Sequence, residues 1–335
     1  MKAIKAGFLF FIVLLTFFST YSFFENKEAL TTFKLYTSPS LQISKDIIEA
    51  YEGGDDLARK DAKEKLIQRT LRNLDYDKWL EFEEYIDLQL HRGHILPNNN
   101  SQLLVVLNLS KDQSVLAIYD FINDAYIYNT KIEGLTPIET IEFVSFEAEN
   151  YDYLIIKQVI DEGLGAFFFE KYMEIYLYNN SSFQRVWNKT LFYEETYKEI
   201  WVNPNASETL WNKIQEETLV DFVNGNPLRI NTVTTFKKMV AQGKEMPKLT
   251  QFTVVQNNTH KNSYYWSPDY NTFILAELSQ TVFLTKAALL QDMELSREAL
   301  YNINNKNYRL ITTKGEIIYL PKSKFQGLFK NLLEE

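Results

Sequence analysis

The chain has 335 residues and a formal net charge of −9, so its surface lacks the basic excess that general nucleic-acid binding requires. Apolar residues make up 45% of the sequence and aromatic residues 15%, a composition that excludes a disordered chain and suffices for one large or two small cores. The absence of cysteine excludes disulfides, thiol nucleophiles and thiolate metal sites, so stability must come from packing.

The N-terminus has the pattern of an export signal. Lys2 and Lys5 precede residues 7–24, a nearly unbroken apolar run without charge. We expect residues 1–24 to be a signal peptide or, if they are retained, a signal anchor that holds the protein to the membrane through residues 7–24. The length of the run permits both. The rest of the chain is then extracytoplasmic, either membrane-anchored or secreted, and an exported chain without cysteine favours a bacterial source.

The next two segments are predicted to be a linker and a helical region. Residues 25–42 carry threonine, serine and proline without sustained periodicity, which is typical of a linker. Residues 43–97 are predicted to form a helical segment, because apolar residues recur there at helical spacing. The run Gly53-Gly54-Asp55-Asp56 is interpreted as a junction in which glycines end one helix and an aspartate caps the next.

Residues 101–278 are predicted to form an antiparallel β-rich domain, because the apolar period changes from helical to two. Residues 103–109 and 114–122 are apolar on both faces, as in central strands. Residues 153–160 and 166–178 flank an acidic and glycine-rich turn and give the clearest hairpin. The remaining predicted strands are shorter: residues 183–190, 218–223, 229–237, 252–256 and 272–275.

Residues 279–335 are predicted to form a helix–β-hairpin–helix packed on the β-rich domain. Helical spacing covers residues 286–301, a hairpin covers residues 308–320, and a short helix begins at Ser323. In outline this resembles a winged helix-turn-helix, although the usual turn glycine is missing and an exported segment does not meet DNA. The predicted fold class is therefore α+β, and no nucleic-acid partner is expected.

The sequence shows no recognisable catalytic, metal or cofactor motif. His91 and His94 have ligand-like spacing, but Gly93 interrupts the helix and no carboxylate joins them at a useful offset. Asp161 and Glu162 are adjacent and point in different directions, and acidic residues beside glycine are ordinary turn formers. The known nucleophile, zinc and phosphate-loop motifs are absent. We therefore predict no catalytic residue, no metal site and no cofactor.

Two aromatic groups are candidates for a binding surface. One surrounds a predicted turn at Ser267-Pro268-Asp269, and the other alternates along one face of a predicted strand. The candidate residues are Tyr264, Tyr265, Trp266 and Tyr270 in the first group, and Glu170, Tyr172, Glu174 and Tyr176 in the second. Aromatic faces stack on sugars and on peptide side chains, but core packing and a solvated sheet face explain the same residues.

These patterns favour a non-enzymatic binding or interaction module of the bacterial envelope. The expected partners are another envelope protein or a cell-wall glycan, bound through the aromatic and acidic residues. The second hypothesis is an extracytoplasmic hydrolase that uses Asp and Glu residues which the sequence does not identify. The third is a membrane-tethered DNA-binding protein, which requires the C-terminal part to lie in the cytoplasm.

Overall fold

A computed structural model describes residues 42–98, 100–145, 151–163, 167–179, 181–278, 285–301 and 306–324. The predicted export segment lies outside these residues, as do the linker up to residue 41 and the terminal helix beyond residue 324. No helix among the described residues is both long enough and apolar enough to cross a membrane. The described chain divides into two compact units: unit 1 holds residues 42–92, 100–107 and 115–132, and unit 2 holds the rest.

Unit 1 begins with two helices joined as the sequence predicts. Helix α2 (Lys45–Gly53) ends at the glycines, and helix α3 (Asp56–Asn73) begins after Asp55, whose side chain accepts a hydrogen bond from the backbone N–H of Ala58 at 2.8 Å. Gly54 is required by a close approach, because a Cβ there would lie 2.4 Å from the carbonyl oxygen of Ala50. The interpretation of this run as a helix junction is confirmed.

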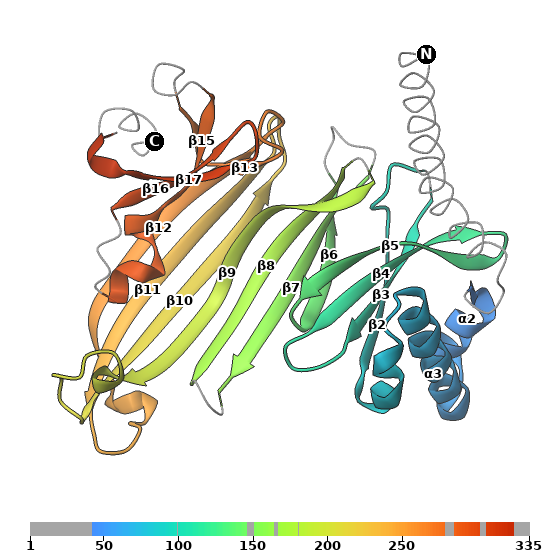
Figure 1. The fold of residues 1–335 in the computed structure, drawn as a ribbon, viewed down its shortest axis with the longest axis horizontal. Coiled ribbons are helices and arrows are strands. Elements are labelled where there is room, and N and C mark those ends of the chain that lie inside the picture. Colours follow the sequence, from blue (N-terminus) through green and yellow to red (C-terminus); the bar gives the residue numbers. More distant parts are fainter. Residues whose placement is uncertain are drawn as a thin grey trace, which may run out of the picture. The chain divides into compact units, whose positions relative to one another are not determined.

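Besides its helices, unit 1 contains a five-stranded sheet with the strand order β1-β5-β4-β3-β2 (Figure 1). Its strands are β1 (Ile43–Ser44), β2 (Asp87–Gly93), β3 (Gln102–Asn108), β4 (Ser114–Ile122) and β5 (Ala125–Leu135). Residues 103–107 of β3 and 115–119 of β4 are buried without interruption, which confirms the two predicted central strands. The predicted helical segment ends early: a 3-10 helix, η1 (Asp77–Tyr85), follows α3, and the residues after it form β2.

A buried tyrosine joins α3 to β4. The hydroxyl of Tyr119 donates to Oγ1 of Thr70 at 3.1 Å and accepts from Nδ2 of Asn73 at 3.1 Å. We expect Tyr119→Phe to lower the free energy of unfolding of unit 1 by about 1–3 kcal/mol, because both partners lose a hydrogen bond while they stay buried. Urea denaturation followed by the helical circular dichroism signal measures this change. Tyr85→Phe, at an exposed tyrosine, is the control, and an equal effect of the two variants would contradict the packing described.

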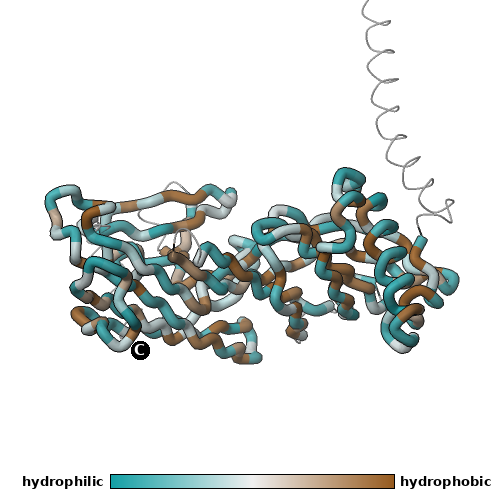
Figure 2. Tube along the Cα trace, turned by 90° about the horizontal axis from the view of Figure 1, so that it is seen from below, coloured by the Kyte–Doolittle hydropathy of each residue, from teal (hydrophilic) through white to brown (hydrophobic). Residues whose placement is uncertain are grey.

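Unit 2 contains a sheet of eight antiparallel strands in the order β13-β12-β11-β10-β9-β8-β7-β6 (Figure 1). Hydrophilic and hydrophobic residues are interspersed along the described chain (Figure 2). The predicted hairpin of residues 153–178 is confirmed as β7 and β8. The predicted strands that correspond to β9, β10, β11 and β12 are present and longer than predicted, whereas β13 is one residue shorter and β6 was not predicted. The eight strands are β6 (Ile138–Val144), β7 (Tyr153–Glu162), β8 (Phe168–Asn179), β9 (Ser182–Lys198), β10 (Leu210–Val223), β11 (Arg229–Gln242), β12 (Thr253–Ser267) and β13 (Thr272–Ile274).

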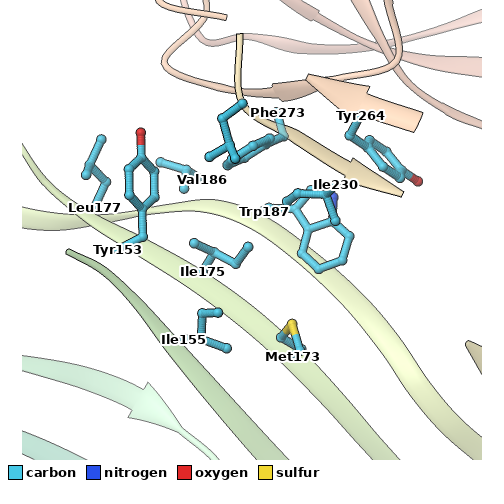
Figure 3. Packing of buried hydrophobic residues seen from close by; sticks show 11 residues of the cluster. Tyr153, Ile155, Met173, Ile175, Leu177, Val186, Trp187, Ile230, Tyr264 and Phe273 are labelled. Atoms are coloured by element: carbon cyan, nitrogen blue, oxygen red, sulfur yellow. The ribbon is translucent and has the colours of Figure 1, made fainter. Parts of the chain in front are cut away.

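The main core of unit 2 forms where this sheet bends (Figure 3). Oγ1 of Thr272 in β13 donates to the carbonyl oxygen of Val186 in β9 at 2.5 Å, although three strands separate β13 from β9 in the sheet order. Between them the ring of Trp187 meets the ring of Tyr264 nearly edge-on, with the centroids 5.7 Å apart. The buried cluster comprises Tyr153, Ile155, Met173, Ile175, Leu177, Val186, Trp187, Leu228, Ile230, Tyr264 and Phe273.

The C-terminal part of unit 2 differs from the prediction. Its hairpin is confirmed, but residues 286–301 form a strand and two 3-10 helices, η4 (Met293–Leu295) and η5 (Arg297–Tyr301), instead of one helix. Pairing with neighbouring strands on both sides outweighs the helical spacing of the apolar residues here. The result is a four-stranded sheet with the order β14-β15-β16-β17, formed by Ala276–Glu277, Ala287–Asp292, Asn307–Thr312 and Ile317–Pro321.

The predicted α+β fold class is therefore wrong. Large antiparallel sheets dominate both units, and the α-helices of the described residues are α2 and α3. A C-terminal helix–β-hairpin–helix is not present in the part of residues 279–335 that the structure describes. The chain is a mostly-β protein, and its N-terminal helices belong to a unit that also contains a sheet.

Candidate functional site

A cavity of about 440 Å³ lies in unit 2 between the large sheet and the C-terminal strands. Strands β9 to β13 form one side of it, and β15, η4, η5, β16 and β17 form the other. Its size is in the range of pockets that hold small molecules. The charged residues that line it are Arg185, Lys189, Glu216, Arg297, Glu298 and Arg309.

Strand register places one of these cations between two carboxylates. Glu170, Tyr193 and Glu216 are direct cross-strand partners on β8, β9 and β10, so their side chains share a face of the sheet. Arg297 of η5 lies above them: its Cζ is 3.6 Å from the centre of the Tyr193 ring, and its Nη1 is 3.4 Å from Oε1 of Glu170. The same Nη1 is 3.6 Å from Oε2 of Glu216. Burial lowers the pKa of Arg297, but the two carboxylates outweigh burial and leave the pKa above its ordinary value.

Glu216 also binds a second cation. Its side chain is only 5% exposed, and its Oε1 accepts a hydrogen bond from Nζ of Lys189 at 3.0 Å. Oε1 of Glu170 accepts one from Oγ1 of Thr190 at 2.6 Å. Both oxygens of Glu216 thus face cations, which leaves neither available to a reacting molecule. The arrangement is that of a buried ion-pair network and not of a general acid and base.

Arg309 differs from the other cations of the cavity. It lies opposite Gln291 in the pairing of β16 with β15, and both residues line the cavity. Its Nε is buried and has no hydrogen-bond partner, and no carboxylate of the described chain forms an ion pair with it. Lys189 and Arg297 are paired as described, and Arg185 contacts Glu174 at 2.5 Å. An unsatisfied buried donor on a charged group costs about 1–3 kcal/mol or more, and an acceptor on a bound molecule would remove that cost.

Tyr264, on the side of the cavity formed by the large sheet, adds a neutral polar group near Arg309. Burial raises the pKa of its hydroxyl to about 12, with a further upward contribution from Glu216 and a downward one from Arg309. The hydroxyl therefore stays protonated at neutral pH. Beside it, Arg309 supplies a permanent positive charge, so this part of the cavity is suited to an anionic group.

No family model matches the chain, and no curated protein matches it either. The function must therefore be inferred from the side chains themselves. Among the cations that line this cavity, Arg309 is the one that ion pairs within the described residues do not account for.

The predicted aromatic group around residue 267 is divided by the fold. Tyr264 and Tyr270 are buried, while Tyr265 and Trp266 are half-buried. Tyr264 and Trp266 belong to the core cluster at the bend, whereas Tyr265 and Tyr270 pack beside Ile274. The turn itself is present, since the N–H of Tyr270 donates to the carbonyl oxygen of Ser267 at 3.2 Å. Partner binding by these aromatic residues stays a prediction.

The predicted face from Glu170 to Tyr176 forms an internal network instead of an open surface. Glu174 is buried and accepts hydrogen bonds from the Tyr176 hydroxyl and from Nε2 of Gln158, both at 2.8 Å. Burial, followed by the charge of Glu174, raises the pKa of Tyr176. The hydroxyl of Tyr172 lies 2.8 Å from Oγ1 of Thr136. Two of the four residues are joined to cations that line the cavity: Glu170 to Arg297, and Glu174 to Arg185.

The residues considered for metal binding or catalysis have structural partners. Nε2 of His94 contacts the carbonyl oxygen of Asn98, and His91 lies in β2. Asp161 accepts a hydrogen bond from the N–H of Gly163 at 3.0 Å, and Glu162 pairs with Lys111 at 3.0 Å. The part of the chain that the structure describes contains no cluster of three His, Asp or Glu residues suited to a metal ion.

The cations that line the cavity were not among the residues predicted from the sequence. Lys189 and Arg309 occur at ordinary polar positions of alternating strands, and Arg297 follows a segment that was predicted to be helical. The available signal was weak: Arg309 is a single charge between Tyr308 and Leu310 in a hairpin strand. Only the register of the sheets brings these residues to one cavity.

Proposed function

We propose that the protein is a non-enzymatic binding module of the cell envelope and that the cavity of unit 2 binds a small anionic molecule through Arg309. The observation that carries this proposal is the buried Nε of Arg309, which has no partner among the described residues although it lies at the cavity wall. The extracytoplasmic location, with a signal peptide or anchor at residues 7–24, is the sequence-based part of the proposal.

The charges of the cavity support an anionic ligand. Four cationic and two acidic residues line it, and the other three cations already contact Glu170, Glu174 or Glu216. A guanidinium group binds carboxylate and phosphate with two parallel hydrogen bonds, so these are the ligand groups that fit Arg309 best. Gln291 beside it supplies a neutral amide that can both donate and accept.

The alternative functions receive less support. A hydrolase needs carboxylates that can act on a substrate, but Glu170 and Glu216 share Arg297, and Glu216 also holds Lys189. The DNA-binding hypothesis relied on a helix over residues 286–301, which form a strand and two 3-10 helices. An envelope protein or a cell-wall glycan remains the proposed larger partner.

Replacing Arg309 with glutamine tests the anion site. Full-length protein, purified in detergent, is titrated calorimetrically with inorganic phosphate and with succinate as a dicarboxylate probe. We expect the wild type to bind at least one of them and Arg309→Gln to weaken binding by about tenfold or more, because a hydrogen bond to a charged group contributes about 1.5–3 kcal/mol.

A second arginine of the same cavity provides the control. Arg185 is paired with Glu174 and its side chain is 55% exposed, so Arg185→Gln is expected to weaken binding by less than about fivefold. If neither anion binds the wild type, or if Arg309→Gln binds as tightly as the wild type, the proposed anion site is refuted.

A further inference from the structure

Unit 2 contains a second, smaller pocket of about 230 Å³ with a different chemistry. It lies where β8 and β9 approach the turn after β12. Of the described residues that line it, none is charged, and aromatic rings and amides prevail. The residues that matter here are Tyr151, Tyr178, Trp266, Asn179, Gln184 and Asn271.

The aromatic rings of this pocket are held in fixed positions. The Trp266 ring is packed nearly edge-on against Tyr153 and Phe273, with centroid distances of 5.9 Å and 5.4 Å. The Tyr178 ring contacts Phe183 at 5.3 Å, and the hydroxyl of Tyr151 donates to the carbonyl oxygen of Tyr178 at 3.2 Å. Rings that are already ordered lose little conformational entropy when a ligand stacks on them.

The polar groups around the rings are neutral and can both donate and accept. Asn179 and Gln184 face each other, with 3.4 Å between Nδ2 and Oε1. Within the described chain the side-chain amide of Asn271 has no hydrogen-bond partner, nor has the indole Nε1 of Trp266, which only donates, and Asn271 is exposed. Amides of this kind match hydroxyl groups, which also donate and accept at once. An anion would find no opposite charge here.

We propose that this pocket binds one pyranose ring of a neutral glycan. An apolar face of the sugar stacks on an aromatic ring, Trp266 or Tyr178, and its hydroxyl groups bond to the amides of Asn271, Gln184 and Asn179. The small volume accommodates a single sugar unit, so a longer glycan contacts the protein through one residue of its chain. This site is separate from the anion cavity, with which it shares only Val186 among its described lining residues.

Two conservative changes test the polar half of the pocket without disturbing the core. Asn271 has a positive φ of 48°, a conformation that glycine adopts freely, so Asn271→Gly removes the amide and keeps the turn. Gln184 is exposed, so Gln184→Ala leaves the packing intact. Two lost hydrogen bonds of about 1 kcal/mol each predict that the double variant binds sugar more weakly by about tenfold or more.

The experiment uses full-length protein in a detergent without a sugar headgroup. The probes are soluble oligosaccharides of N-acetylglucosamine, glucose and galactose, the corresponding free monosaccharides, and insoluble polysaccharide purified from bacterial cell walls. We expect at least one soluble probe to bind, with the loss stated above in the double variant. Binding of oligosaccharide and wall material identifies a wall glycan as the ligand, and binding of monosaccharide alone identifies a free sugar.

Two further variants separate this site from others. Trp266→Leu is expected to weaken sugar binding because it removes one of the two rings on which the sugar can stack, whereas Trp201→Leu, at a tryptophan that is 55% exposed and outside the pocket, is expected to leave binding unchanged. Arg309→Gln should also leave it unchanged. If the folded wild type binds none of the probes at millimolar concentration, or if the double variant binds as well as the wild type, the sugar site is refuted.

Discussion

Replacing Arg297 with methionine is expected to lower the free energy of unfolding of unit 2 by about 3–5 kcal/mol. The substitution keeps a long apolar side chain over the Tyr193 ring but removes the charge between Glu170 and Glu216. The two carboxylates then stay largely buried with fewer cations to offset their loss of hydration. Removing one member of a buried ion pair is costly mainly for that reason.

An exposed pair in the same unit gives the matched control for Arg297. Lys111 is 70% exposed and pairs with Glu162 at 3.0 Å, so Lys111→Met should cost less than about 1 kcal/mol. Adding Glu170→Gln to Arg297→Met should recover part of the lost stability, because one unpaired charge disappears. Urea denaturation measures all three variants. Equal costs for Arg297→Met and Lys111→Met would show that the network is not buried as described.

Replacing Trp187 with alanine is expected to destabilise unit 2 by about 3–5 kcal/mol, through lost burial and the cavity that remains. Trp187 is 6% exposed and belongs to the cluster at the bend of the large sheet, where it contacts Tyr264. The cluster joins β9 to β11, β12 and β13, so the loss should affect the bend as a whole. The hydrogen-exchange rates of the backbone amides of β13 measure the same loss of stability locally.

Trp201 is the natural control for Trp187. Its exposed ring meets Trp211 edge-on at a centroid distance of 5.7 Å, and such pairs contribute about 0.5–1.5 kcal/mol. Trp201→Ala should therefore lower the free energy of unfolding by no more than about 1.5 kcal/mol. A cost for Trp187→Ala as small as this, or unchanged exchange in β13, would contradict the packing shown in Figure 3.

The strands were predictable where a continuous run of apolar residues indicates burial directly. Residues 103–109 and 114–122 are almost continuously apolar, and a buried central strand is the simplest structure for them. Strand β9 was predicted to end at residue 190 but continues to Lys198. Its second half carries Tyr193 and Glu195, which pack beneath η5, and their hydrogen bonds with Tyr301 depend on a segment more than a hundred residues away. The local pattern of apolar residues in β9 does not indicate that a distant segment packs on this strand.

The predicted helix in the C-terminal segment was wrong for a related reason. The spacing of the apolar residues in 286–301 predicted a helix, yet the structure pairs Ala288 with Ile311 and Leu289 with Leu310 in a sheet. The pattern within one segment indicates its intrinsic preference for helix or strand. Whether a strand forms also depends on the neighbouring strands with which the segment can pair.

The candidate sites depend even more on tertiary structure. Lys189, Glu216, Arg297 and Arg309 come from four separate elements, so no spacing in the sequence relates them. The aromatic residues 264–270 form a run in the sequence, but the alternation of strand β12 divides them. Tyr264 and Trp266 share one face and join the core cluster, whereas Tyr265 between them packs beside Ile274. Tyr264 also lines the anion cavity, and Trp266, two residues further along the same face, lines the sugar pocket. The residue types were visible in the sequence, and their grouping was not.

The most direct test of the anion site observes Arg309 itself. Arginine-labelled protein gives a side-chain Nε–H signal for each ordered guanidinium group, and Arg309→Lys assigns the signal of interest. We expect phosphate or succinate to shift the Arg309 signal along a saturable titration while the signal of Arg185 stays nearly constant. An Arg309 signal that does not move at saturating concentrations of either anion would contradict it.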